Sequence, residues 1–240
     1  MNKKYELTDE SIIYNGKKLY RIKALKDFSN VEKGELGGYI ESEYNLSQEN
    51  NCWIYNDAKV YDYARISGNA KVYGNVLVSG YTKIFGNAKV YGNAKVYGHA
   101  LVSDNAAISG NAEIFDYAQI YGYAEIYNHA KVYDYTEVYG NAKICDNAVI
   151  NNSYKIIGKV TNKFDDIIEI QNPKGRLVTA ILRNGKIFYN VGCQDEITEE
   201  VFKDRIENEN GGLENNPHRE YYYRIIDMVN CYFEYNSRRL

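Results

Sequence analysis

Among the side chains of this 240-residue chain that could act in catalysis, the three histidines are the first to consider. A histidine acts as a general base when a second group orients it beside a pocket. His99 and His129 occupy positions where comparable segments of the chain carry Asn. Each is therefore either a candidate base or a replacement for Asn at a structural position, and His218 lies outside those segments.

The cysteines do not suggest a metal site or a redox centre. They are widely scattered, and no two form a Cys-x-x-Cys pair, so we expect free thiols in a reducing cytosol. The sequence accordingly predicts no catalytic residue, no metal and no cofactor. The four cysteines are Cys52, Cys145, Cys193 and Cys231.

The overall charge gives no general attraction to nucleic acid or membranes, because the net charge is only −3. Residues 1–10 are polar and charged, which does not fit a signal peptide, and no apolar run approaches membrane length. We therefore expect a cytoplasmic protein without a membrane partner. Any contact with nucleic acid must rest on a local patch of charge, and no direct sequence-specific binding is expected.

A six-residue period without insertions organises the chain from Ile54 to Ile156. Every sixth residue is β-branched, and two positions earlier stands a small or short residue, usually Ala. Two positions after each β-branched residue stands Gly, Asp or Asn, at the expected turn, because these residues tolerate positive φ values. One such segment cannot bury its aliphatic residue alone, so segments must stack as a solenoid. The β-branched positions are Ile54, Val60, Ile66, Val72, Val78, Ile84, Val90, Val96, Val102, Ile108, Ile114, Ile120, Ile126, Val132, Val138, Ile144, Ile150 and Ile156.

The pattern aliphatic-x-x-Asn-Ala-x resembles the hexapeptide repeat of left-handed parallel β-helix proteins. That resemblance implies a mainly β fold with triangular coils of 18 residues, about six to seven in all, and left-handed winding. This sequence departs from the commonest form of the repeat, since Tyr, Ser or Phe follows the aliphatic residue and Gly comes one position later. The physics of parallel strands alone would favour a right-handed crossover.

The segments on either side of the repeat predict two smaller units. In residues 1–38, two short strands flank Asn15-Gly16, which is a strong hairpin signal, and predict an N-terminal β cap. The β-helix is expected over residues 39–158, with Ile40, Leu46 and Cys52 in the alanine column. Residues 159–240 predict a small α+β domain: strands over 167–171, 177–183 and 186–191, then a helix capped by Thr198 and a longer helix from about His218.

The corner residues test the 18-residue coil. If the coil has this length, corner residues 18 positions apart lie on one edge and should be of similar types. Tyr gathers at one corner, whereas the other two carry mainly Asn. Three aspartates directly precede members of the aromatic column, so we interpret this corner as a ridge of rings bordered by negative charge. Stacking of the rings on one another is the structural alternative. We call this candidate binding surface the aromatic edge; it comprises Tyr63, Tyr81, His99, Tyr117 and Tyr135 with Asp62, Asp116 and Asp134.

Three functions fit these observations. Residues from about 4 to 156 resemble a group of phage and prophage hexapeptide-repeat proteins, through segments such as Gly34-Glu35-Leu36-Gly37-Gly38. This resemblance implies a non-enzymatic binding protein in the cytoplasm of an infected or lysogenic bacterial host. Its partner would be a host protein or protein–nucleic-acid complex. The protein would inhibit this partner, as a β-helical anti-CRISPR does. Hexapeptide-repeat acyltransferases, which act as trimers with a His base, are the second possibility. A self-assembling structural protein is the third, and homo-oligomers could form through the β-helix faces or the C-terminal domain.

Overall fold

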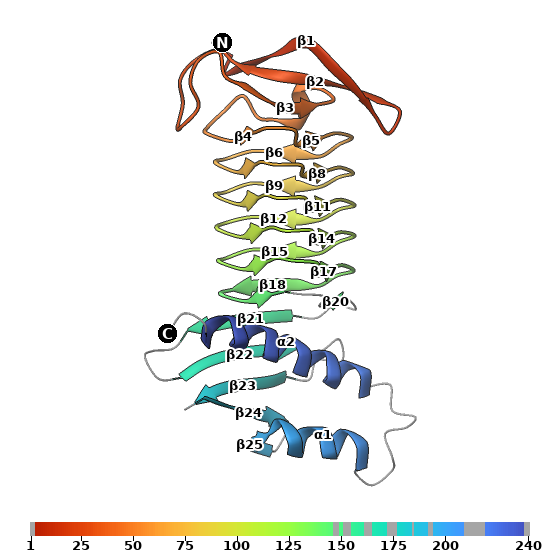
Figure 1. Cartoon of the computed structure of the whole chain (residues 1–240), viewed down its shortest axis with the longest axis vertical. Helices are drawn as coiled ribbons and strands as arrows, with labels where there is room; N and C mark the ends of the chain where they lie inside the picture. The colour runs from red at the N-terminus through yellow and green to blue at the C-terminus, as the bar shows by residue number, and fades with distance from the viewer. Residues whose placement is uncertain are drawn as a thin grey trace.

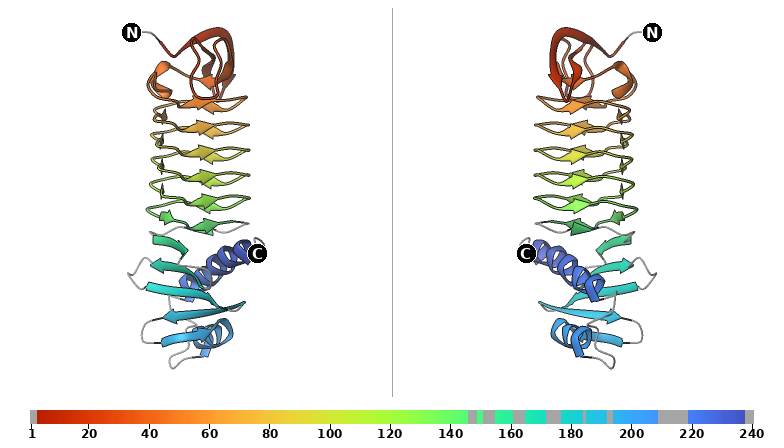
Figure 2. Two further views of the ribbon diagram at one scale, coloured as in Figure 1. Left: turned by 90° about the vertical axis from the view of Figure 1, so that its left-hand side faces the viewer. Right: turned by 90° about the vertical axis from the view of Figure 1, so that its right-hand side faces the viewer.

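The chain is described here from a computed structural model that covers residues 3–145, 149–150, 155–160, 165–171, 177–183, 185–191, 194–208 and 219–237. It is a tall parallel β-solenoid with a hairpin at the N-terminal end and a small sheet with two helices at the C-terminal end (Figure 1). The side views show the coils stacked as flat layers along one axis (Figure 2). The fold class expected from the sequence is confirmed as a mainly β parallel solenoid.

Each coil contributes one short strand to each of three sheets, which are the faces of the prism. Residues 18 apart are register partners, such as Val90 with Val72 and Ile108. The predicted coil length is therefore confirmed, and the strands of sheet 1 count six coils in the described part of the chain. Sheet 1 comprises β4 Trp53–Ile54, β7 Lys71–Val72, β10 Lys89–Val90, β13 Ala107–Ile108, β16 Glu125–Ile126 and β19 Lys143–Ile144.

The other two faces follow the same rule. Sheet 2 comprises β5 Lys59–Val60, β8 Leu77–Val78, β11 Lys95–Val96, β14 Glu113–Ile114, β17 Lys131–Val132 and β20 Val149–Ile150. Sheet 3 comprises β6 Arg65–Ile66, β9 Lys83–Ile84, β12 Leu101–Val102, β15 Gln119–Ile120, β18 Glu137–Gly140 and β21 Lys155–Val160.

The interior of the prism is a continuous apolar column. In a central coil, Val96 and Ala94 are fully buried, whereas Lys95 between them points to solvent, as alternation along a strand requires. The small residue stands beside the corner, and this position holds Ala in most coils but also admits the buried Val76, Thr82 and Thr136. Burial of the β-branched residues, each worth about 2 kcal/mol, is the main force that stacks the coils.

The corners turn through a residue with positive φ. Gly92 has a φ of 76° there, and Asp104 takes the same conformation at 57°. Asn and Asp are the non-glycine residues that adopt this left-handed region most readily. The recurrence of Gly, Asn and Asp two positions after each aliphatic residue is thus a backbone requirement.

The N-terminal end is closed by the predicted hairpin, β1 Tyr5–Tyr14 and β2 Lys17–Ala24, which turns at Asn15-Gly16. β2 pairs with β3 (Leu36–Ile40), which joins sheet 2 beside β5. A Cβ on Gly37 would lie 2.5 Å from the carbonyl oxygen of Ile54, so the chain passes too close there for any larger residue. A short 3₁₀ helix, η1 Glu43–Asn45, follows.

The first coil corrects one detail of the sequence analysis. Ile40 is the register partner of Val60, and Leu46 that of Ile66, at separations of 20 residues. Both side chains therefore occupy the β-branched column, and the expectation that they lie in the alanine column is wrong. Cys52, which directly precedes β4, keeps the alanine position and is buried. The first coil is therefore longer than the 18-residue coils that follow. Its additional residues lie in the turn after Leu46, before the six-residue period begins.

At the C-terminal end, sheet 3 continues beyond the solenoid. β21 pairs antiparallel with β22 (Asp165–Gln171), and β23 (Leu177–Arg183), β24 (Lys186–Val191) and β25 (Gln194–Thr198) follow. Three of these strands were expected, and β25 was missed. The helices are α1 Glu199–Asn208 and α2 Arg219–Ser237. The division at residues 38 and 158 remains a prediction.

Helix α2 lies across the last coils and contacts β19 and β22 (Figures 1 and 2). Ile225, Val229 and Tyr232 form its buried stripe. Cys231 of α2 is joined by a disulfide to Cys145, which follows β19. The expectation of free thiols is therefore wrong for this pair, because the helix brings together two residues 86 positions apart; Cys52 is free, and Cys193 lies outside the described residues.

Candidate functional site

The five rings of the aromatic edge form one continuous stack at the corner between sheets 2 and 3. Successive ring centroids lie 4.8, 4.9, 4.7 and 4.9 Å apart, and the planes are within 9° of parallel. The structure thus brings together the predicted rings on adjacent coils. The column is Tyr63, Tyr81, His99, Tyr117 and Tyr135.

These rings remain open to solvent although they are stacked. The exposed fraction is 60% for Tyr63, 54% for Tyr81, 46% for Tyr117 and 64% for Tyr135. Because each inner ring has a neighbour on both faces, the surface presents ring edges and hydroxyl groups. A planar ligand can stack only at the ends of the column, which disfavours stacking of successive nucleotide bases along it.

The two other corners hold their coils together by a different ladder. At the corner between sheets 3 and 1, the side-chain amide of Asn69 donates to Asn87, and Asn87 donates to Asn105. At the corner between sheets 1 and 2, Asn75, Asn93 and Asn111 form the same ladder, which ends at His129. Backbone hydrogen bonds join the coils at all three corners, and the side chains add amide ladders at two of them and aromatic stacking at the third.

The outward tyrosines on the faces also stack on one another and are more buried than the corner rings. The Phe115 ring lies between Tyr97 and Tyr133, at centroid distances of 4.9 and 4.6 Å. Tyr73 stacks on Tyr91, and Tyr121 on Tyr139. Their faces are therefore used within the fold, and the most accessible aromatic surface is the corner column.

The aspartates of the aromatic edge have a structural explanation that the sequence analysis did not give. Asp62, Asp116 and Asp134 all take positive φ values, of 58°, 53° and 57°, so each occupies the left-handed position of its corner. The other residues of this corner column are Gly80 and Gly98. Asp at these sites therefore meets a backbone requirement, whatever charge it also brings.

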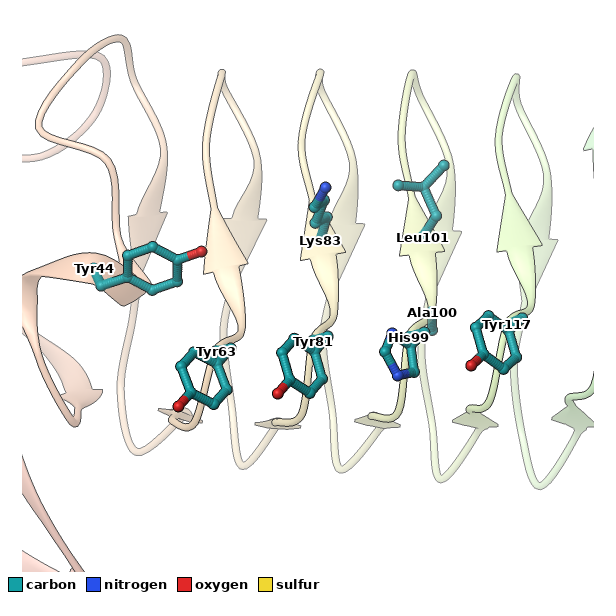
Figure 3. Close-up of a pocket in the computed structure, with 8 residues that line it drawn as sticks. All are labelled: Tyr44, Tyr63, Tyr81, Lys83, His99, Ala100, Leu101 and Tyr117. Carbon is teal, nitrogen blue, oxygen red and sulfur yellow. The ribbon is translucent and has the colours of Figure 1, made fainter.

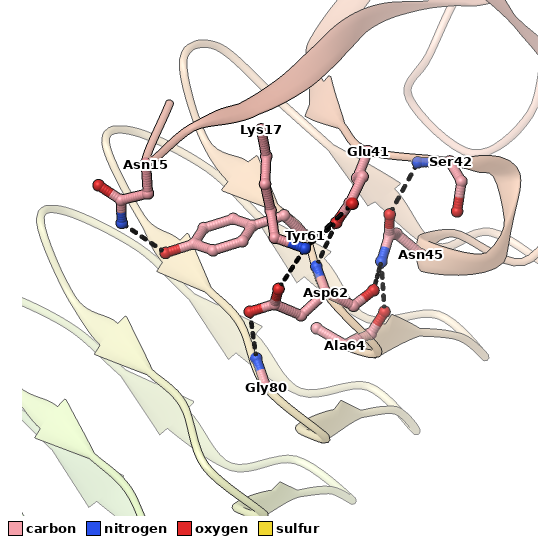
Figure 4. A network of polar contacts seen from close by, with 9 residues as sticks. All are labelled: Asn15, Lys17, Glu41, Ser42, Asn45, Tyr61, Asp62, Ala64 and Gly80. Carbon is pink, nitrogen blue, oxygen red and sulfur yellow. Dashed lines mark hydrogen bonds and ion pairs between the residues drawn. The ribbon is translucent and has the colours of Figure 1, made fainter. Parts of the chain in front are cut away.

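Asp62 is moreover engaged in a polar network with the N-terminal cap (Figure 4). Its carboxylate lies 2.6 Å from Lys17 Nζ and accepts a hydrogen bond from the Gly80 amide at 3.2 Å. Lys17 also contacts Glu41 at 3.0 Å, and the Asp62 amide donates to Glu41. One lysine thus serves two carboxylates at this end of the ridge, where Asp62 is held in contacts with the N-terminal cap.

A pocket of about 390 Å³ lies beside the aromatic edge, over sheet 3 (Figure 3). Tyr44 of η1 closes one end, and the stacked rings form one wall. Lys83 and Leu101 project from successive strands on the opposite side. The pocket therefore combines an aromatic wall with one cation, an arrangement suited to a small anionic or polar group. The lining residues are Tyr44, Tyr63, Tyr81, Lys83, His99, Ala100, Leu101 and Tyr117.

Of the two histidines considered as bases, His99 is the one beside a pocket. Its ring is held between Tyr81 and Tyr117, and no carboxylate hydrogen bond orients it in the part of the chain described here. His129 has a ring nitrogen 3.1 Å from the Asn111 amide and so completes an Asn ladder. His129 thus replaces Asn at a corner, whereas His99 has access to a ligand. His218 lies outside the described residues.

The described residues contain no group of three or more metal-ligating His, Cys, Asp or Glu side chains. Within the same ranges, no helix is both long enough and apolar enough to span a membrane.

Part of the chain is similar to known proteins. Residues 64–80 match the family of YdcK beta solenoid repeats. The chain is also 40% identical, over 62 aligned residues, to a protein of Escherichia coli strain K12 described as the uncharacterized acetyltransferase YdcK. That alignment covers 22% of this chain and 19% of the relative, so the chain matches about a fifth of the relative's length. The family match lies within the repeat region, where the chain is similar to β-solenoid proteins.

Proposed function

We propose that this protein is a non-enzymatic binding protein that attaches to a host protein or protein–nucleic-acid complex through the aromatic edge and inhibits it. The observation that carries the proposal is the exposure of the corner rings, between 46% and 64% for the four tyrosines. Asn ladders connect the coils at both other corners, so coil stacking does not require aromatic residues at this one.

The stack gives the edge properties that favour protein recognition. Each ring is held by its neighbours, so it loses little side-chain entropy when a partner binds. Tyrosine is enriched at protein interfaces and at their energetic centres because it joins an apolar ring to a hydroxyl group. The edge thus offers a straight row of hydroxyl groups on a rigid support, with the pocket beside Lys83 as a second point of contact.

Charge along the edge suggests how a partner is oriented. Asp62 pairs with Lys17, which also contacts Glu41, and Lys83 lies in the pocket near that end. Asp116 and Asp134 lie toward the C-terminal end of the edge. We expect a partner surface that is basic opposite Asp116, such as the groove of a nucleic-acid-binding protein. A phage-encoded inhibitor of host defence that acts in the bacterial cytoplasm is the biological role that fits such a partner.

The test is a triple variant, Tyr81→Asn, Tyr117→Asn and Tyr135→Asn, used with the wild type to capture partners from bacterial lysate. Asn already serves the other corners, so the variant should keep its circular dichroism spectrum and lose the specific partner. Tyr123→Asn is the matched control, since Tyr123 is 64% exposed at a different corner. Capture that is equal for all three proteins would reject the proposal.

A second candidate function is acyl transfer, favoured by the relative described as an acetyltransferase and by the position of His99 beside the pocket. An acyltransferase of this class would act as a trimer and use His99 as the general base. Purified protein should then transfer the acyl group of acetyl-coenzyme A to an amine and elute as a trimer in size-exclusion chromatography with light scattering. Turnover that needs an intact trimer would overturn the non-enzymatic proposal.

A further inference from the structure

Two pairs of like charges stand in direct register at the N-terminal part of the solenoid. Arg65 of β6 is the register partner of Lys83 of β9 on sheet 3, and Lys71 of β7 is that of Lys89 of β10 on sheet 1. Like charges opposite one another on neighbouring strands destabilise a sheet. The four residues flank the corner between sheets 3 and 1, and we call them the cationic corner.

In later coils, charged register partners on neighbouring strands have opposite sign. On sheet 2, Glu113 lies 3.1 Å from Lys95 in the preceding coil and 3.3 Å from Lys131 in the following coil. Glu125 pairs with Lys143 on sheet 1, and Glu137 with Lys155 on sheet 3. The same columns that hold like charges in the early coils therefore hold ion pairs in the later ones.

No acidic side chain forms an ion pair with the cationic corner within the described ranges. Lys71 donates a hydrogen bond to the neutral side chain of Asn30, and the Arg65 guanidinium lies 5.6 Å from the centre of the Tyr44 ring. Neither contact cancels a charge. Lys83 and Lys89 are exposed, and each lines a surface pocket, Lys89 together with Lys71, Tyr55 and Tyr73. In the described part of the chain, folding thus leaves two pairs of neighbouring cations, one on each side of the corner, without an acidic partner.

We propose that the cationic corner binds the phosphate backbone of a nucleic acid without reading its sequence. The Asn69–Asn87–Asn105 ladder runs between the two columns of cations, and its amides are already bonded to one another. The corner therefore offers cations and amides and has no large exposed apolar side chain between the columns. Protein interfaces are depleted in lysine and centred on apolar or aromatic residues, whereas interfaces with nucleic acid are polar and strongly positive.

Lys83 also lines the pocket beside the aromatic edge, so it belongs to both candidate surfaces. Lys71 and Lys89 belong to sheet 1, and neither lines the pocket beside His99. Replacement of Lys71 and Lys89 should therefore leave the aromatic edge intact. Both surfaces would be used together if the partner is a protein–nucleic-acid complex, with the aromatic edge against the protein and the cationic corner against the phosphates.

The experiment measures binding of the full chain to a fluorescently labelled DNA duplex of mixed sequence by anisotropy, over a series of salt concentrations. The double variant Lys71→Gln and Lys89→Gln should bind more weakly than the wild type. The slope of log affinity against log salt should become shallower by about one for each lysine that contacts a phosphate. A second duplex of unrelated sequence should give the same affinity.

The matched control is Lys95→Gln with Lys131→Gln, which removes the same charge from sheet 2, where both lysines pair with Glu113. Its affinity and salt slope should stay close to those of the wild type. An equal loss in both double variants would overturn the proposal, because the attraction would then come from net charge. Absence of DNA binding by the wild type would overturn it too, as would binding to polyglutamate that exceeds binding to DNA.

Discussion

His99 stacks on Tyr81 with the ring centroids 4.9 Å apart and the planes 4° from parallel. Tyr117 lies on the opposite face of the imidazole, at 4.7 Å. The imidazole therefore occupies a ring position in a column whose other members are all tyrosine. Any aromatic ring would continue the stack at this position, whereas a role as general base would need the imidazole itself.

His99→Tyr separates these two roles. The variant should fold and unfold as the wild type does, within about 0.5 kcal/mol in urea, since stacking is kept and the site is exposed. If the protein transfers acyl groups with His99 as the base, turnover should fall by a factor of at least about 100. Destabilisation by several kcal/mol would contradict the view that this position needs only a ring.

Val96 tests the interior of the prism. It is fully buried at the centre of the solenoid and pairs with Val78 and Ile114. Val96→Asp should prevent stable folding, because an unpaired buried carboxylate costs several kcal/mol and the buried Val contributes about 2 kcal/mol. Circular dichroism and protease resistance measure the outcome. The neighbouring Lys95→Gln is the control and should remain folded, and a folded Val96→Asp protein would contradict the apolar column.

Much of the fold could be predicted from the sequence because the period is strict. In each hexad, burial of the β-branched residue, the small residue beside the corner and the left-handed turn residue all favour the same coil. Where the period is absent, this argument fails. The turn after Leu46 shifts the first coil, and strand β25 and the Cys145–Cys231 contact depend on how α2 and the terminal sheet pack.

The sequence predicted which rings form the candidate site but not the contacts of its charged residues. The spacing of 18 residues was enough to align the five rings. It could not show that Asp62 pairs with Lys17, because that contact joins the hairpin to the second coil, 45 positions along the chain. The basic residues of the cationic corner can be found in the sequence, but the sequence does not show that like charges lie opposite one another. That requires the register of the paired strands.

Gly98 tests the corner geometry. Its φ is 72°, and a Cβ there would lie 2.7 Å from the amide nitrogen of Asp116 in the next coil. Asp116 occupies the same position of its own corner with a φ of 53°, so aspartate is tolerated where a β-branched residue is not. Gly98→Val should therefore destabilise the solenoid by about 2 kcal/mol more than Gly98→Asp in urea unfolding. Equal stabilities of the two variants would show that the corner relaxes freely.

The carboxylate of Glu113 carries the clearest pH dependence on the solenoid. Burial acts to raise the pKa of Glu113, but hydrogen bonds and charge from Lys95 and Lys131 outweigh it, and the net pKa is lowered. The folded state therefore binds fewer protons than the unfolded chain between the two pKa values, so this contribution to stability rises with pH there. It is complete above the unfolded pKa of about 4.3 and is lost as the pH falls through the lowered folded value.

Glu113→Gln removes this contribution. At pH 7 the variant should be less stable than the wild type by about 1 kcal/mol, the scale of two partly exposed ion pairs. The difference should shrink as the pH is lowered from about 6 to about 3, because the wild-type carboxylate becomes protonated and the ion pairs are lost. The free energy of urea unfolding, measured across this range at low salt, reports the effect, and added salt should reduce the pH 7 difference. A stability difference that stays constant across the whole range would mean that the amide itself disturbs the face, and that the Lys95–Glu113–Lys131 ladder does not stabilise the stacked coils through charge.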